Sequence, residues 1–69
     1  MSVYDFLNYC IDDYLVVEIW FLEREVFECI YNGEVQNIDS EIGLYIVKSF
    51  ECISKNGVPI LILNVNYTI

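Results

Sequence analysis

The chain has 69 residues, of which 57% are hydrophobic, and its eleven acidic and three basic residues give a formal net charge of −8. Nucleic-acid binding requires a basic patch, and anionic membranes repel an acidic surface, so the sequence argues against direct binding to either. A domain this short buries only about 60% of its unfolded surface. The apolar excess therefore favours a homodimer, or a protein partner with a basic surface.

The residue inventory argues against catalysis. The chain contains no histidine, the usual base for a serine or cysteine nucleophile, and no glycine-rich loop that would hold phosphates. We therefore expect no enzymatic activity, no cofactor and no metal. The sequence shows neither a signal peptide nor an apolar run long enough to span a membrane, so the expected location is the cytoplasm. Three widely spaced thiols without a CxxC pair predict buried, reduced cysteines: Cys10, Cys29 and Cys52.

The chain opens with a predicted helix over residues 3–10. Ser2 can cap this helix, and Asp5 is favourable near the positive end of its dipole. Asp12 and Asp13 then end the helix and start a loop. The apolar stripe of the helix follows a spacing of three and four residues: Val3, Phe6, Leu7 and Cys10.

Residues 14–21 and 26–31 predict the two strands of a hairpin, because both are rich in β-branched and aromatic residues. A three-residue loop over 23–25 would align two apolar pairs on one face: Phe21 with Phe27, and Ile19 with Cys29. The other face would then collect Glu18, Trp20, Glu28 and Ile30. A two-residue loop would scramble these faces, because a slip of one residue turns every side chain over.

The connection to the next strand carries two further signals. Asn32-Gly33 predicts a turn, and residues 34–37 form a connector. Asn37 or Asp39 can cap a brief helical turn that runs through Ile42 and ends at Gly43.

The rest of the chain predicts a second hairpin. Asn56-Gly57 supplies the positive φ angles of a tight turn between strands over 44–53 and 58–65. The last strand is apolar on both faces, which indicates that it is covered on both sides, and Pro59 suits its first residues. The core face of the earlier strand would hold Leu44, Ile46, Phe50 and Cys52, with Lys48 as the exception.

Together these elements predict a single α+β domain over residues 1–69. An N-terminal helix packs on a mostly antiparallel four-stranded sheet, in the order α-β-β-(short α)-β-β. One helix covers only one face of such a sheet. The second face, with one side of the last strand, needs a dimer or a partner to cover it.

The candidate site is a partner-binding surface rather than an active site. Trp20 beside Glu18 and Glu28 is typical of an interface, where aromatic residues anchor and acids meet basic groups. The alternative is that Trp20 lies in the core under the helix. Asp12 and Asp13 could hold a metal, but adjacent acids in such a loop are more often solvated. The predicted partner-binding residues are Asp12, Asp13, Glu18, Trp20, Glu23, Glu25 and Glu28.

The overall layout resembles small acidic proteins encoded by phages and prophages. The resemblance rests on Val3-Tyr4-Asp5-Phe6-Leu7, a hairpin, Ile38-Asp39-Ser40-Glu41-Ile42, and a closing hairpin through Asn56-Gly57-Val58. Some proteins of this group are anti-CRISPR or other anti-defence inhibitors. The resemblance implies a non-enzymatic inhibitor in the host-cell cytoplasm that binds the basic, nucleic-acid-binding surface of a CRISPR or other defence effector, as a DNA mimic. The alternative is a self-associating phage structural or accessory protein, a homodimer without an inhibitory role.

Overall fold

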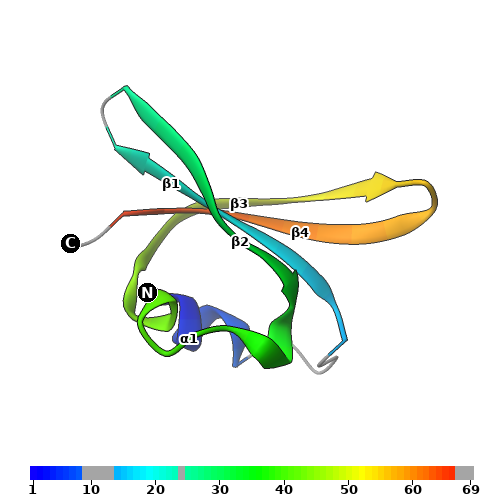
Figure 1. Ribbon diagram of the computed structural model, residues 1–69, viewed down its shortest axis with the longest axis horizontal. Coiled ribbons are helices and arrows are strands. Elements are labelled where there is room, and N and C mark those ends of the chain that lie inside the picture. Colours follow the sequence, from blue (N-terminus) through cyan, green and yellow to red (C-terminus); the bar gives the residue numbers. More distant parts are fainter. Residues whose placement is uncertain (9–13, 24, 67–69) are drawn as a thin grey trace.

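The computed structural model describes residues 1–8, 14–23 and 25–66. It contains one short helix and one four-stranded sheet, so the expected α+β class is confirmed (Figure 1). No helix in these described ranges is long and apolar enough to cross a membrane. The elements in chain order are α1 (Val3–Leu7), β1 (Val16–Glu23), β2 (Val26–Glu34), the 3-10 turns η1 (Val35–Asn37) and η2 (Ile42–Leu44), β3 (Ile46–Lys55) and β4 (Val58–Asn66).

The sheet consists of two antiparallel hairpins joined side by side. Its strand order is β2-β1-β4-β3, and the two central strands, β1 and β4, run parallel to one another. A parallel pair requires a crossover connection, and here the segment from β2 through η1 and η2 carries the chain beneath the sheet to β3 (Figure 1). The sheet is therefore mostly antiparallel, as expected, while its one parallel seam was not anticipated.

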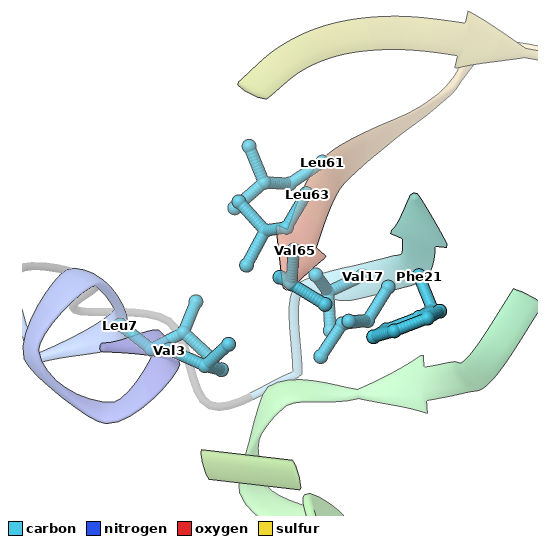
Figure 2. Packing of buried hydrophobic residues seen from close by; sticks show 8 residues of the cluster. Val3, Leu7, Val17, Phe21, Leu61, Leu63 and Val65 are labelled. Carbon is cyan, nitrogen blue, oxygen red and sulfur yellow. The ribbon is translucent and has the colours of Figure 1, made fainter. Parts of the chain in front are cut away.

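The hydrophobic core lies between the central strands and α1. Val17 and Ile19 of β1 and Leu63 of β4 are completely buried, and they face the equally buried Val3 of α1. Figure 2 shows Leu61, Leu63 and Val65 stacked along β4 beside β1, with the helix opposite them. Both central strands are strongly apolar, which explains why they occupy the middle of the sheet.

The N-terminal residues hold α1 against the sheet. Ser2 forms an isolated antiparallel bridge with Ile46, and the Val47 N–H donates to the Met1 carbonyl at 2.9 Å. Ser2 Oγ also accepts from the Asp5 N–H at 3.1 Å, so the predicted cap is confirmed. The helix is shorter than the expected 3–10: it ends at Leu7, and the last two of those positions lie outside the described residues.

The register of the first hairpin differs from the expected one. Glu23 pairs with Val26, so the connection has two residues instead of three, and Phe27 lies opposite Leu22. A shift between Ile19 and Trp20 inserts an extra residue into β2. As a result Phe27 shares the face of Trp20, whereas Glu28, which pairs with Phe21, lies on the opposite face. The expected faces of Phe27 and Glu28 were therefore both wrong, because shortening the loop by one residue turns these side chains to the other face of the sheet.

The predicted turn at Asn32-Gly33 is also wrong, because both residues continue β2 and pair with Glu18 and Val17. The expected brief helical turn is present as η2, and Asp39 Oδ1 accepts from the Glu41 N–H at 2.8 Å just before it; the other 3-10 turn, η1, was not expected. Gly43 lies within η2 instead of after it, and it is buried because the ring of Tyr4 lies directly over its Cα.

The second hairpin follows the prediction at its turn and departs from it at its start. Asn56 and Gly57 have φ values of 53° and 80°, and Pro59 lies one residue before the pairing of β4 with β1 begins. β3 begins two residues later than expected, and Leu44 is 69% exposed in η2. Lys48, the predicted exception, is the extra residue of a bulge, which places Val47 rather than Ile46 on the core face.

Candidate functional site

One face of the sheet carries no helix in the described part of the chain. In Figure 1, α1 and the segment of residues 35–44 lie on the same side of the sheet. We call the opposite side the open face. It is formed by side chains that alternate with those of the core, and its main members are Glu18, Trp20, Leu22, Phe27, Ile53, Lys55, Ile60 and Ile62.

Two aromatic rings stack on the open face. Trp20 and Phe27 have ring centroids 4.6 Å apart and an interplanar angle of 17°. They are brought together because Trp20 pairs with Cys29 and Leu22 pairs with Phe27, so the two aromatics are diagonal neighbours on one face. Trp20 therefore does not lie under α1: it is half-buried, and Phe27 keeps 59% of its surface exposed.

Glu18 lies beside this aromatic pair and holds two donors. Its Oε1 accepts from the indole Nε1–H of Trp20 at 3.0 Å, and its Oε2 accepts from Lys55 Nζ at 3.2 Å. These hydrogen bonds, first from Trp20 and then from Lys55, lower the pKa of Glu18 against the opposing effect of burial. Only 7% of Glu18 is exposed. Glu18 was predicted to contact a partner. In the structure its carboxylate instead binds Trp20 and Lys55 of the same chain and holds the indole ring in place.

The end of the first hairpin presents apolar and acidic side chains together. We call residues 22, 23 and 25–28 the hairpin tip; they project beyond the rest of the sheet (Figure 1). Leu22, Val26 and Phe27 are 44%, 51% and 59% exposed. Three acids in the same segment are exposed as well, and all three belong to the predicted site: Glu23, Glu25 and Glu28.

The structure thus brings part of the predicted site together. Glu18, Trp20, Glu23, Glu25 and Glu28 all belong to one hairpin, but Glu28 is separated from Glu18 and Trp20 by the thickness of the sheet. Asp12 and Asp13 lie outside the described residues. Phe27 and Leu22 are exposed but were not predicted as site residues. A two-residue loop, the alternative considered from the sequence, places both on the open face.

Acidic and cysteine side chains are the potential metal ligands in the described part of the chain. No group of three or more histidine, cysteine or acidic side chains is arranged there to hold a metal ion. Cys29 and Cys52 are free and exposed, so the expectation that they are buried was wrong; Cys10 lies outside the described residues. Cys29 is exposed because it lies on the open face, opposite Trp20 and two residues after Phe27.

Comparisons of the chain with protein-family models, with curated proteins and with solved structures found no match. The features of the chain that bear on its function are therefore the hairpin tip, the open face and the net charge of −8.

Proposed function

We propose that this chain is a non-enzymatic binding protein that uses its hairpin tip to occupy a basic, nucleic-acid-binding surface of another protein. In keeping with the resemblance to small acidic phage proteins, its partner would be a CRISPR or other defence effector in the cytoplasm of the host cell. The observation that carries the proposal is the exposure of apolar and acidic side chains together at the end of one projecting hairpin, on both of its faces.

The apolar side chains of the tip would supply affinity. Full burial of a leucine, valine or phenylalanine side chain is worth about 1.5–3 kcal/mol. Leu22, Val26 and Phe27 are each roughly half exposed, so covering them would contribute on the order of 1 kcal/mol each. Phe27 is the natural anchor, because its ring already rests on Trp20 at 4.6 Å and loses little freedom when a partner covers it.

The acidic side chains would steer the chain toward a basic surface and accelerate association with it. Glu23, Glu25 and Glu28 are exposed around the apolar tip, and the whole chain carries a net charge of −8. A negative field of this kind accelerates encounter with a basic surface and weakens as salt screens it. Such a surface is also the one that nucleic acid uses, so the two ligands would compete.

The test is displacement of labelled DNA from a panel of purified CRISPR effectors, measured at low and high salt. We expect the unmodified chain to displace DNA from a target effector, and a Glu25→Lys/Glu28→Lys variant to lose at least about tenfold in potency, a loss that 1.4 kcal/mol would cause. An Asp5→Lys/Glu41→Lys variant is the matched control, because it changes the net charge equally with exposed acids outside the tip.

A Phe27→Ala variant should weaken displacement at both salt concentrations, because its contribution is apolar. If the control variant loses as much potency as the tip variant, the tip is not the binding site. Failure of the unmodified chain to displace DNA from any effector of the panel would refute a DNA-competing role against these effectors.

A further inference from the structure

The outer edge of β3 is the longest uninterrupted strand edge in the described part of the chain. The Ser2 bridge to Ile46 and the bulge at Lys48 occupy only its start, and no described segment pairs with the outer side of residues 49–55. The other edge strand, β2, is interrupted by its bulge near Ile30. Proteins use bulges of this kind to protect sheet edges from pairing with other chains. Over residues 49–55 the β3 edge has no such bulge.

The turn geometry shows which backbone groups of β3 point outward. With φ positive at Asn56 and Gly57, the connection is a two-residue turn of the kind closed by a hydrogen-bonded pair, here Lys55 and Val58. Hydrogen-bonded and non-bonded pairs alternate along an antiparallel ladder. The N–H and C=O groups of Lys55, Ile53 and Glu51 therefore point toward β4. The outward groups belong to Phe50, Cys52 and Ser54.

The position of Pro59 agrees with this alternation. Pro59 pairs with Ser54, which the alternation makes a non-bonded pair, so the missing N–H of proline costs no hydrogen bond to β3. The edge thus offers a regular set of unpaired donors and acceptors to an incoming strand.

We propose that a second copy of this chain pairs antiparallel with this edge, with Ile53 opposite the Ile53 of the second copy. The outward N–H and C=O groups of Cys52 would then form hydrogen bonds with those of the second copy's Ser54. Ser54 would bond to the second copy's Cys52 in the same way. The two sheets would join into one continuous sheet, with both open faces on the same side.

Charge complementarity selects this register. The outward groups of one copy lie opposite outward groups of the other only when the antiparallel pair is centred on a residue, not between two residues. Centring the pair on Glu51 would oppose two carboxylates, and centring it on Cys52 would oppose Glu51 with Ile53. Centring it on Ile53 opposes Glu51 with the second copy's Lys55, twice, which is the favourable arrangement for cross-strand charges. Lys55 already lies on that face, held by Glu18 at 3.2 Å.

The dimer edge is separate from the hairpin tip, because β3 forms one edge of the sheet and β2, which carries part of the tip, forms the other (Figure 1). The proposal therefore does not depend on the proposed function, and a dimer would carry two tips. The paired segment is short, so the expected association is weak and depends on protein concentration.

The first test is sedimentation velocity over a range of concentrations. We expect the unmodified chain to shift from monomer to dimer, and Glu51→Lys to raise the dimer Kd at least about tenfold, because two opposite-charge pairs become two like-charge pairs. Glu41→Lys makes the same charge change away from the edge and should leave the Kd unchanged. A chain that stays monomeric at every concentration, or equal effects of the two variants, would overturn the proposal.

The register is tested by oxidation of single-cysteine variants in a Cys10→Ser/Cys29→Ser/Cys52→Ser background. Two residues that face each other as a non-bonded pair have Cα atoms about 4.5 Å apart, within the range that a disulfide spans. Ile53→Cys should therefore cross-link readily. Glu51→Cys should not, because the two copies of that position would be about 13 Å apart along the strands. Faster cross-linking at position 51 than at position 53 would overturn the proposed register.

Discussion

Replacement of Glu18 with glutamine isolates the charge of the buried carboxylate on the open face. Glutamine has nearly the same shape, and its oxygen can still accept the indole N–H of Trp20, which donates at 3.0 Å in the native protein. The substitution removes the negative charge that this N–H and the Lys55 ammonium group both approach. The lowered pKa of Glu18 gives the sign: the fold prefers the carboxylate over its neutral form, so the substitution should destabilise.

The expected loss is about 1–2 kcal/mol of unfolding free energy. A hydrogen bond to a charged group is worth about 1.5–3 kcal/mol and a neutral one about 0.5–1.5, so the Trp20 bond loses on the order of 1 kcal/mol. The ion pair adds little, about 0.2–1 kcal/mol, because 59% of the Lys55 side chain is exposed. A domain of this size has only about 3–5 kcal/mol to lose.

Urea unfolding followed by tryptophan fluorescence measures the effect directly, because Trp20 is the single tryptophan of the chain. A carboxyl group whose pKa is lowered by folding stabilises the protein above its ordinary value of 4.5 and loses that contribution as the pH falls through the lower folded value. The difference between the native protein and Glu18→Gln should therefore be full at neutral pH and shrink progressively as the pH falls below 4.5.

Glu28→Gln is the matched control for this prediction. It makes the same change in charge on the same hairpin, but Glu28 is exposed. We expect its effect on the free energy of unfolding to stay within about 0.5 kcal/mol at neutral pH. Equal losses for the two variants, or a Glu18→Gln penalty that persists in acid, would refute the claim that the Trp20 and Lys55 contacts favour the charged carboxylate.

Three further predictions concern packing and titration. Leu63→Ala should cost about 2–5 kcal/mol at a completely buried site and leave much of the protein unfolded by circular dichroism. Gly43→Ala should destabilise by about 1–3 kcal/mol in thermal unfolding, because the new Cβ would overlap the Tyr4 ring, and adding Tyr4→Ala should recover part of the loss. Burial, and then the charge of Glu34, raise the pKa of Tyr31, so the stability that it contributes is lost as the pH rises above 10.0; Tyr31→Phe should remove a late-titrating component from the ultraviolet titration of the tyrosines.

The second hairpin could be predicted from the sequence because its signals are local. Asn56 and Gly57 are residue types that accept positive φ, and their φ angles of 53° and 80° in the structure confirm the predicted turn. The strand that follows is apolar on both faces and was expected to be covered on both sides. It does lie in the middle of the sheet, but described elements cover only its core face, and the sequence did not indicate that β1 would be its parallel neighbour. That pairing joins segments far apart in the chain, and no local pattern specifies it.

The register of the first hairpin could not be predicted, because the residues between its strands carry no turn preference. The Glu23-Arg24-Glu25 segment contains neither glycine nor asparagine. Its two-residue connection moved Phe27 to the open face and Glu28 away from Glu18. The sequence therefore indicated the right hairpin for Glu18, Trp20 and Glu23 but the wrong faces for Phe27 and Glu28, and no pattern in it indicated the bulge in β2.

The parallel seam between β1 and β4 has a consequence for the folding rate. Each antiparallel hairpin can form by itself within microseconds, since its strands are adjacent in the chain. The seam, in contrast, pairs Val16 with Ile60 and Phe21 with Val65, and closing so long a loop costs entropy before any core contact rewards it. We expect seam closure to be the rate-limiting step, with both hairpins already formed in the transition state. Mutations at the tight turn at Asn56-Gly57 would then slow folding, whereas mutations of residues that α1 contributes to the core would mainly accelerate unfolding.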